Sequence, residues 1–273
     1  MSQRLLKNAP RRVVEAVAVA VVLLIAVYMR WVWGELWIVN WIPLPSVIVL
    51  ANWFPIFLAV LGAAFWKRME DSSWPRKLPI QAALLTAAAW SVLYVIPRSP
   101  PECRDEWIPA EPPVPFRICR QTTPYTCSAA ASATILEMLG METTEAEMAT
   151  LCLTSSGTTW LGMYHGLSIK LMPSGHGVKF FQGTVDDVSQ LAGTRPILLC
   201  CQLTEATAAA QPSYVEEGGW IPGVQHSVVC FAVSNGNFWI GDPSQDHLER
   251  WSRRDMEVLW TGTGLMVIDY AAQ

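Results

Sequence analysis

The sequence predicts a chain of two parts: an all-α transmembrane region of about three helices, followed by an α+β domain in which helices pack on an antiparallel sheet. The first observation is charge. Residues 1–98 carry 10 Lys and Arg against 4 Asp and Glu, a net charge of +6, whereas residues 99–273 carry 9 against 19, a net charge of −10. The second is composition, because 52% of the residues are hydrophobic and only 15% are charged, which is typical of a protein partly in lipid. The third is order, since helical patterns precede strand patterns in the second half.

Three long apolar stretches predict the membrane-spanning segments. A helix needs roughly 20 apolar residues to cross a bilayer core. Val13–Met29 is almost wholly apolar, Leu36–Trp66 is uncharged for 31 residues, and Pro79–Pro97 is uncharged for 19. The predicted spans are about 13–33, 45–66 and 79–97, inside a transmembrane region of residues 1–98.

The middle stretch is too long for one straight span and too short for two. Pro43 and Pro45 interrupt it, and proline breaks a helix interior. We therefore expect residues 36–44 to lie at the membrane interface, where indole rings prefer the headgroup level. The alternative is one long tilted helix. Four tryptophans favour the interfacial interpretation: Trp31, Trp33, Trp37 and Trp41.

Lys and Arg in short loops set the expected orientation, because they stay on the cytoplasmic side. One basic group precedes the first span, and a second follows the second span. With three spans, residues 99–273 would lie outside the cytoplasm, attached to a bacterial inner or cytoplasmic membrane. A fourth span would reverse the side. The basic residues are Arg4, Lys7, Arg11 and Arg12, then Lys67, Arg68, Arg76 and Lys77.

A proline-rich linker, residues 99–116, separates the two parts, since such density gives an extended and stiff spacer. The domain after it, residues 117–273, has the size of a single domain. Its acidic charge argues against a nucleic-acid partner, which would need a basic footprint. The expected partners are the lipid bilayer and a peptide or protein.

Local patterns predict the elements of this domain. Cys127–Leu139 is expected to be helical with Gly140 as its stop, and three further helices are expected at 144–150, 159–171 and 186–191. Thr143 or Thr144 would cap the second, with Glu147 as the capping-box acid. Strands are expected at 196–203, 227–233, 238–240 and 265–270. Asn235-Gly236 between two of them is typical of a tight hairpin.

Cys127 stands at the start of the first predicted helix of the domain. A helix N-terminus offers free N–H groups and a partial positive charge, and both stabilise a thiolate, which is the nucleophilic form of cysteine. The small residues that follow it would let the helix pack closely beneath a site. A buried structural cysteine explains this segment equally well.

Three residues elsewhere complete a possible site. His226 opens a predicted strand and could accept the thiol proton, as in cysteine–histidine pairs. Asp242 ends the next strand and could hold the imidazole in one tautomer. Gln121, six residues before Cys127, could donate its amide N–H to an oxyanion.

With Gln121, Cys127, His226 and Asp242-Pro243 in this order and spacing, the chain resembles the peptidase C39 family, the papain-like domain of bacteriocin-processing transporters. The resemblance spans about residues 117–270. It implies a papain-like cysteine peptidase fold, with Cys127 as nucleophile, His226 as base, Asp242 as its orienting group and Gln121 as oxyanion donor. It also implies a peptide or precursor protein as substrate and a thiol peptidase activity that needs no cofactor.

Two features depart from the family. Ser128 stands where the family usually has Gly directly after the cysteine, and the chain lacks the phosphate-binding motif of an ATP-binding cassette. We therefore expect a free-standing, membrane-tethered domain. Two alternatives stay open: a catalytically silent peptide-binding domain that serves a separate membrane exporter, or a hydrolase of cell-wall peptides.

The remaining cysteines and histidines lack metal-ligand spacing, so no metal is expected. Cys200 and Cys201 are adjacent on a predicted strand and are expected to be core positions on opposite faces. Cys103 and Cys119 flank the linker, and a disulfide between them is a reasonable expectation if the domain lies outside the cytoplasm. The other histidines are His165, His176 and His247.

Overall fold

The computed structural model describes residues 10–93, 96, 102–192, 195 and 197–269. Its backbone contacts divide the chain into two compact units. Unit 1 comprises Met1–Ile38 and Ser46–Ile96, and unit 2 comprises Val39–Pro45 and Pro97–Gln273.

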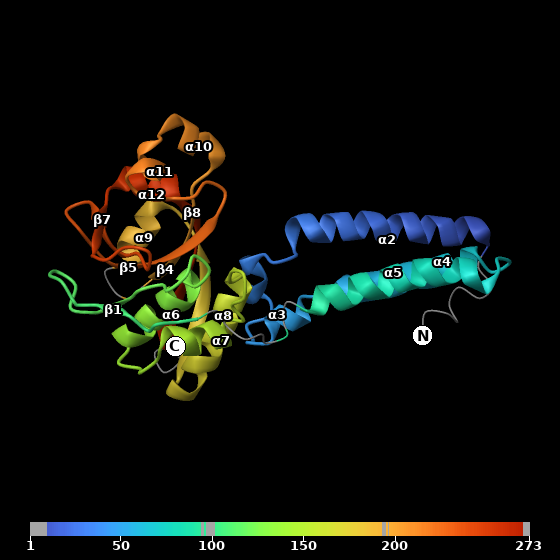
Figure 1. Ribbon diagram of the computed structural model, residues 1–273, viewed down its shortest axis with the longest axis horizontal. Helices are drawn as coiled ribbons and strands as arrows, with labels where there is room; N and C mark the ends of the chain where they lie inside the picture. The colour runs from blue at the N-terminus through green and yellow to red at the C-terminus, as the bar shows by residue number, and fades with distance from the viewer. Residues whose placement is uncertain (1–9, 94–95, 97–101, 193–194, 196, 270–273) are drawn as a thin grey trace. The chain divides into compact units, whose positions relative to one another are not determined.

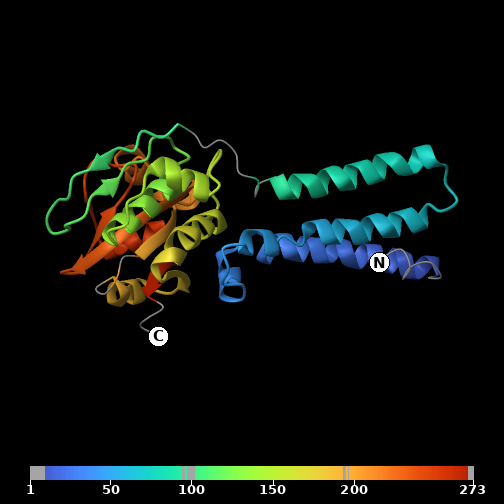
Figure 2. The same cartoon turned by 90° about the horizontal axis from the view of Figure 1, so that it is seen from below.

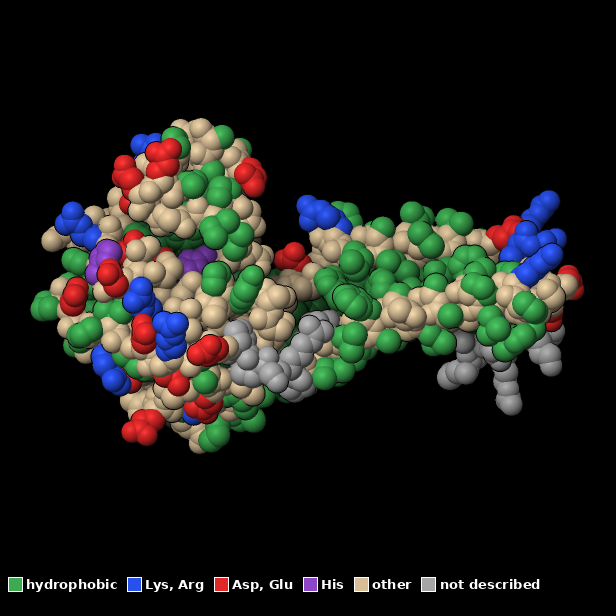
Figure 3. Space-filling view, viewed as in Figure 1, with side chains coloured by type: hydrophobic (Ala, Val, Ile, Leu, Met, Phe, Trp, Pro, Cys, Tyr) green, Lys and Arg blue, Asp and Glu red, His purple; other side chains and the backbone are tan. Residues whose placement is uncertain are grey.

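Unit 1 is built from helices. They are α2 (Arg11–Trp31), α3 (Val47–Leu50), α4 (Phe54–Arg68) and α5 (Trp74–Leu93), and a 3-10 turn, η1 (Leu36–Asn40), follows α2. Figure 2 shows α2 alongside α4, and α5 returning beside α4. Val21 of α2 packs with Leu58 and Leu61 of α4. Hydrophobic side chains cover the flanks of these helices, and Lys and Arg gather at one end (Figure 3).

Two segments, Arg11–Trp31 and Val47–Arg68, are long and apolar enough to cross a membrane. The alternative of one long helix over 36–66 is wrong, because the chain turns after η1 and again between α3 and α4. The third predicted span coincides with most of α5, but that helix begins at Trp74 and includes Pro79 within it. Its role as a span stays a prediction, and its predicted end, at residue 97, lies outside the described residues.

Unit 2 contains the antiparallel sheet that the sequence predicts, so the α+β fold class is confirmed. Six strands follow the order β3-β8-β4-β5-β6-β7, and a separate pair joins β1 to β2. The strands are β1 (Trp107–Ile108), β2 (Ile118–Cys119), β3 (His176–Gln182), β4 (Ile197–Gln202), β5 (Gln225–Ser234), β6 (Asn237–Gly241), β7 (Glu249–Trp251) and β8 (Trp260–Asp269).

Helices cover both faces of this sheet. They are α6 (Cys127–Met138), α7 (Glu145–Leu151), α8 (Trp160–Leu171), α9 (Val185–Leu191), α10 (Glu205–Ala210), α11 (Ser213–Glu216) and α12 (Arg253–Leu259). Figure 1 shows α6, α7 and α8 on one side and α9, α11 and α12 on the other. Val188 of α9 and Met256 of α12 share a core with Ile197 and Leu199 of β4.

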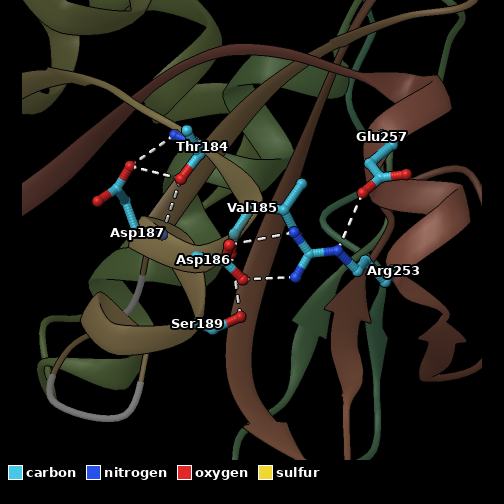
Figure 4. Close-up of polar contacts among 7 residues, drawn as sticks. All are labelled: Thr184, Val185, Asp186, Asp187, Ser189, Arg253 and Glu257. Carbon is cyan, nitrogen blue, oxygen red and sulfur yellow. Dashed lines mark hydrogen bonds and ion pairs between the residues drawn. The ribbon is translucent and has the colours of Figure 1, made fainter.

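A surface ion pair joins α9 to α12. Thr184 caps α9 through the backbone N–H of Asp187, and the Asp187 carboxylate accepts from the Thr184 N–H in return. Arg253 reaches from α12 to Asp186 with two guanidinium nitrogens and also contacts Glu257 (Figure 4). These acids are therefore structural surface groups, as their sequence context suggests.

Most predicted elements of unit 2 are confirmed within a few residues, including the hairpin. Asn235 and Gly236 have φ of +50° and +73°, which fits the tight turn between β5 and β6. One detail is wrong. Thr144 caps α7, but the Glu147 carboxylate does not close a capping box, because it binds the Thr143 hydroxyl and Lys170 instead.

Candidate active site

Cys127 is the first residue of α6, and a small turn fixes its position. The Thr126 N–H donates to the Thr123 carbonyl, and the Thr123 N–H donates to the Thr126 hydroxyl, at 3.2 and 3.1 Å. Ala129 to Ala131 are fully buried, so this end of α6 lies close to its neighbours. The Ser128 hydroxyl is 2.9 Å from that of Ser227, which places the start of α6 against the head of β5.

The surroundings of the Cys127 thiol favour its ionised form. Burial raises its pKa, but hydrogen bonding and charge interaction with His226 outweigh burial, so the pKa lies below the ordinary 9.0. The Ser227 backbone N–H and the Ser128 hydroxyl add to the lowering. The residue is buried, with 8% of its surface exposed.

His226 is the second residue of β5 and lies between the thiol and a carboxylate. Its Nε2 is 2.7 Å from Oδ1 of Asp242, which leaves Nδ1 for the thiol proton. Burial lowers the pKa of His226, but the charges of Asp242 and Cys127 raise it to about 10. Trp220 packs edge-on against the imidazole, with 5.3 Å between the ring centroids. The imidazole therefore lies between the Cys127 thiol and the Asp242 carboxylate, with Trp220 packed against its ring.

Asp242 directly follows β6 and is 1% exposed. Its Oδ1 accepts from the backbone N–H and the hydroxyl of Ser244, both at 2.7 Å. Burial raises its pKa, but His226 and Ser244 together hold it below the ordinary value. Gly241 is required before it, because a Cβ there would lie 2.5 Å from the Phe231 ring. The acid that orients His226 is thus fixed by its own turn.

Gln121 lies in the same cavity as the histidine and the acid. Its backbone N–H donates to the Pro243 carbonyl at 2.8 Å. Its side-chain Oε1 is buried and has no hydrogen-bond partner in the described part of the chain. The cavity holds about 80 Å³, and its lining does not include Cys127. The lining residues are Gln121, Pro124, Gly218, Gly219, Trp220, Ile221, Val224, Gln225, His226, Asp242 and Ser244.

The structure therefore brings together the four residues singled out from the sequence. It adds three that the sequence reasoning missed. Ser244 follows Asp-Pro, and a hydroxyl at this place in a turn is a usable signal for a residue that binds the acid. Trp220 belongs to the loop before β5, and nothing in the sequence links it to His226. Glu249 of β7 is the third, and burial together with the charge of Asp242 raises its pKa to about 7.

The other cysteines are structural. The expected Cys103–Cys119 disulfide is not formed in the structure. Burial raises the pKa of Cys103 to about 11 and that of Cys119 further, and the nearby Glu145 and Asp105 add to both. Cys200 and Cys201 are fully buried core residues, as predicted. Among the described residues, no group of three or more His, Cys, Asp or Glu could hold a metal ion.

Comparison with known proteins gives structural neighbours only. No protein-family model matches the sequence, and no curated protein matches it. The peptidase domain of Streptococcus ComA, a bifunctional ABC transporter, aligns with 56% of this chain and 98% of its own, at 18% identity and a TM-score of 0.45. A double-glycine motif protease from an AMS/PCAT transporter, solved with its leader peptide, covers 61% and 94%, at 14% identity and a TM-score of 0.41.

A third neighbour is the N-terminal peptidase C39-like domain of a toxin secretion ATP-binding protein from Vibrio parahaemolyticus. It covers 54% of this chain and 99% of its own, at 13% identity and a TM-score of 0.37. Identities of this size carry no residue roles across to this chain.

Proposed function

We propose that this chain is a membrane-anchored cysteine peptidase that cleaves a peptide or precursor protein by acyl transfer. The observation that carries the proposal is the geometry of the site: Cys127 begins α6, and Nε2 of His226 lies 2.7 Å from Oδ1 of Asp242. The pKa of Cys127 lies below that of an ordinary thiol, and the pKa of His226 lies above that of an ordinary imidazole. Both shifts favour a thiolate–imidazolium pair, which is the reactive form of a cysteine nucleophile.

Acylation follows from this geometry. The Cys127 thiolate attacks the scissile carbonyl carbon, and the electron pair of the C=O bond moves to the oxygen. The resulting tetrahedral oxyanion collapses and expels the amine, which takes the Nδ1 proton of His226. Asp242 keeps Nε2–H engaged throughout, so the imidazole holds one orientation. The products of this half are the amine fragment and a thioester on Cys127.

Deacylation uses the same groups in reverse. Neutral His226 takes a proton from water, the hydroxide oxygen attacks the thioester, and the Cys127 thiolate leaves. In both halves the oxyanion needs hydrogen-bond donors. The Gln121 side chain lines the cavity, where its carboxamide N–H can donate, and the N–H groups of Cys127, Ser128 and Ala129 lie at the start of α6, where a helix has no intrahelical acceptor for them. These are the two donors that the proposal assigns.

Residues 1–98 serve as the membrane anchor in this proposal, and residues 99–116 as the linker to the catalytic domain, residues 117–273. The two segments able to cross a membrane, together with α5 as a third span, would place the site on the extracytoplasmic side, since Arg11 and the Lys67–Arg68 pair lie at the basic ends of their helices. A reporter fused after residue 273 tests the side. Activity of a cytoplasm-specific reporter there would contradict three spans.

Thiol labelling tests the nucleophile. Full-length protein in detergent is treated with iodoacetamide at pH 7, as wild type, Cys127→Ser and Cys103→Ser. Cys103 is the matched control, because it is the one cysteine of intermediate exposure and its pKa is raised to about 11. We expect Cys127→Ser to abolish the fast phase and Cys103→Ser to keep it. Equal labelling of wild type and Cys127→Ser would mean that Cys127 is not activated.

Turnover separates the peptidase from the two alternatives. A library of linear peptides, a library of cell-wall peptides and a non-cleavable control are incubated with wild type and with His226→Ala. Cleavage of linear peptides by wild type alone supports the proposal. Cleavage confined to wall peptides supports the wall hydrolase. Tight binding of peptides with background hydrolysis by both proteins supports the silent binding domain.

A further inference from the structure

Glu145 is a buried carboxylate that the mechanism above does not use. It is the first residue of α7, and its side chain is fully buried. One carboxylate oxygen accepts the backbone N–H of Thr122 at 2.7 Å, and the other accepts the Thr122 hydroxyl at 2.5 Å. A buried polar group is costly unless it is hydrogen-bonded, and Thr122 supplies a hydrogen bond to each of the two oxygens.

Thr122 directly follows Gln121, the assigned oxyanion donor. The Gln121 N–H is bound to the Pro243 carbonyl, and the Thr122 N–H is bound to Glu145. These are the peptide groups on the two sides of the Gln121 Cα. When both peptide planes are fixed, φ and ψ of Gln121 are fixed, and so is the direction of its Cα–Cβ bond. The carboxamide then enters the cavity from one defined direction.

We propose that Glu145 is a positioning residue that aims the Gln121 carboxamide at the oxyanion. It touches neither substrate nor Cys127, and it acts only through the Thr122 backbone. The inference rests on the proposed function, because it assumes that acyl transfer passes through an oxyanion at this cavity. Preorganised donors contribute to the rate only when they stand within a few tenths of an ångström of the developing charge.

The segment before the domain, which includes Arg104 and Asp105, also contacts Thr122 and α7. The Arg104 N–H donates to the Thr122 hydroxyl at 2.8 Å, and the Asp105 carboxylate accepts the Ala146 N–H of α7 at 3.0 Å. Thr122 thus donates its hydroxyl hydrogen to Glu145, and its hydroxyl oxygen accepts the Arg104 N–H. Its hydroxyl is satisfied on both sides, which favours a single geometry for the loop.

Two probes separate oxyanion stabilisation from nucleophile activation. With p-nitrophenyl acetate, the Cys127 thiolate adds to the ester carbonyl, the oxygen becomes anionic, and p-nitrophenolate leaves to give the acetyl thioester. With iodoacetamide, the thiolate displaces iodide at a saturated carbon, and no oxyanion forms. The ratio of the acylation rate to the alkylation rate therefore reports the oxyanion donors and cancels the thiolate fraction.

The variants are Glu145→Gln, Thr122→Val and Gln121→Ala, each in full-length protein in detergent. Glu147→Gln is the matched control, since Glu147 lies on the same helix but is surface-exposed, with its carboxylate on Lys170 and Thr143. We expect Glu145→Gln and Thr122→Val to lower the acylation-to-alkylation ratio by roughly 10-fold, and Gln121→Ala by roughly 10- to 100-fold. Glu147→Gln should leave the ratio within about 2-fold of wild type.

A double variant tests whether Glu145 acts through Gln121. If it does, Glu145→Gln in the Gln121→Ala background lowers the ratio no further, because the donor that it aims is already gone. A merely structural role would lower both rates together, so the ratio in Glu145→Gln would stay at the wild-type value. That result, or a further fall of the ratio when Glu145→Gln is added to Gln121→Ala, overturns the proposal.

Failure of the proposed function gives a different signature. If wild type reacts with iodoacetamide no faster than Cys127→Ser, the catalytic assignment fails. In that case, amide hydrogen exchange of residues 117–126 tests whether Glu145 holds the backbone around Gln121 in place. Faster exchange in Glu145→Gln but not in Glu147→Gln supports the anchoring of Gln121 by Glu145, and equal exchange in both variants overturns it.

Discussion

Replacement of His226 by glutamine is the sharpest test of the charge state of the site. Glutamine can still offer an amide N–H toward Asp242, but it carries no positive charge and takes no proton. Burial of Cys127 then raises its pKa against only the Ser227 N–H and the Ser128 hydroxyl, so we expect the pKa to return toward the ordinary 9.0. A thiol with that pKa is about 1% ionised at pH 7. The higher intrinsic nucleophilicity of a more basic thiolate offsets part of this loss, so we expect alkylation at pH 7 to fall about 10- to 100-fold.

The same change alters stability in a pH-dependent way. In the wild type, the pKa of Asp242 is lower in the folded protein than in the unfolded chain, where it is about 3.9. The contribution of Asp242 to folding stability is therefore present above the unfolded pKa and is lost as the pH falls through the folded pKa. Without His226, burial raises the folded pKa of Asp242 above the unfolded one. The variant therefore loses stability as the pH rises from about 4, and by pH 7 the deficit against wild type should reach about 3 kcal/mol.

The assay is the rate of iodoacetamide alkylation from pH 5 to pH 10, with urea unfolding at pH 4 and pH 7. His247→Gln is the matched control, because His247 is half-exposed and its Nδ1 lies 2.9 Å from Oδ1 of its neighbour Asp246. We expect the wild-type rate to be nearly flat through neutral pH, and the His226→Gln rate to rise about tenfold for each pH unit up to its thiol pKa. Superimposable profiles for wild type and His226→Gln would refute the thiolate–imidazolium pair.

Three further changes test the surroundings of this pair. Gly241→Ala should destabilise the fold by about 1–3 kcal/mol, measured by urea unfolding, because the new Cβ would meet the Phe231 ring at 2.5 Å. Ser244→Ala should cost about 1.5–3 kcal/mol and raise the pKa of Asp242, measured by carboxyl NMR, because the hydroxyl bond at 2.7 Å to a buried carboxylate is lost. Glu249→Gln should stabilise the protein by about 2 kcal/mol at pH 8 and by little at pH 5, because a carboxyl with a pKa of about 7 opposes folding only when ionised.

The sequence predicted the elements whose signals are local. The helix after Cys127 has its Gly140 stop, and Thr159 caps α8 as its position suggests. The β5–β6 hairpin follows from Asn235-Gly236, whose left-handed backbone angles few other dipeptides tolerate. These features depend on residues within a few positions of each other, so a single sequence is enough to find them.

The elements that escaped prediction depend on distant neighbours. β8 begins at Trp260, five residues before the predicted start at 265. The prediction began too late because Gly262 and Gly264 resemble a loop. Gly264 is instead required by packing, since a Cβ there would lie 2.5 Å from both the Leu198 carbonyl and the Phe181 ring. The unpredicted β3, which pairs along β8, contributes Phe181 to this contact. Neither strand can be recognised without the other.

The residues of the candidate site also fall into a group with local sequence signals and a group that depends on distant neighbours. Residue type and spacing were enough to single out Cys127, His226, Asp242 and Gln121, because each lies at the start or end of a predictable element or close before one. The groups that tune them come from elsewhere: Trp220 packs on the imidazole from a loop, and Glu249 adds negative charge from an edge strand. Their role requires the fold, since no periodicity or spacing relates them to the catalytic residues.

Each proposed catalytic group is held in place by hydrogen bonds from neighbouring groups. His226 is aimed by its place on β5 and by Asp242, Asp242 is held by the Ser244 N–H and hydroxyl, and Gln121 is fixed by hydrogen bonds on both flanking peptides. The main-chain bonds among these do not depend on rotamer choice, so they cost little side-chain entropy to maintain. Ser128 fits this pattern, because its hydroxyl lies 2.9 Å from that of Ser227 and also lowers the pKa of the Cys127 thiol, as a glycine there could not. The departure from glycine after Cys127 therefore ties the start of α6 to the head of β5 through a pair of hydroxyls.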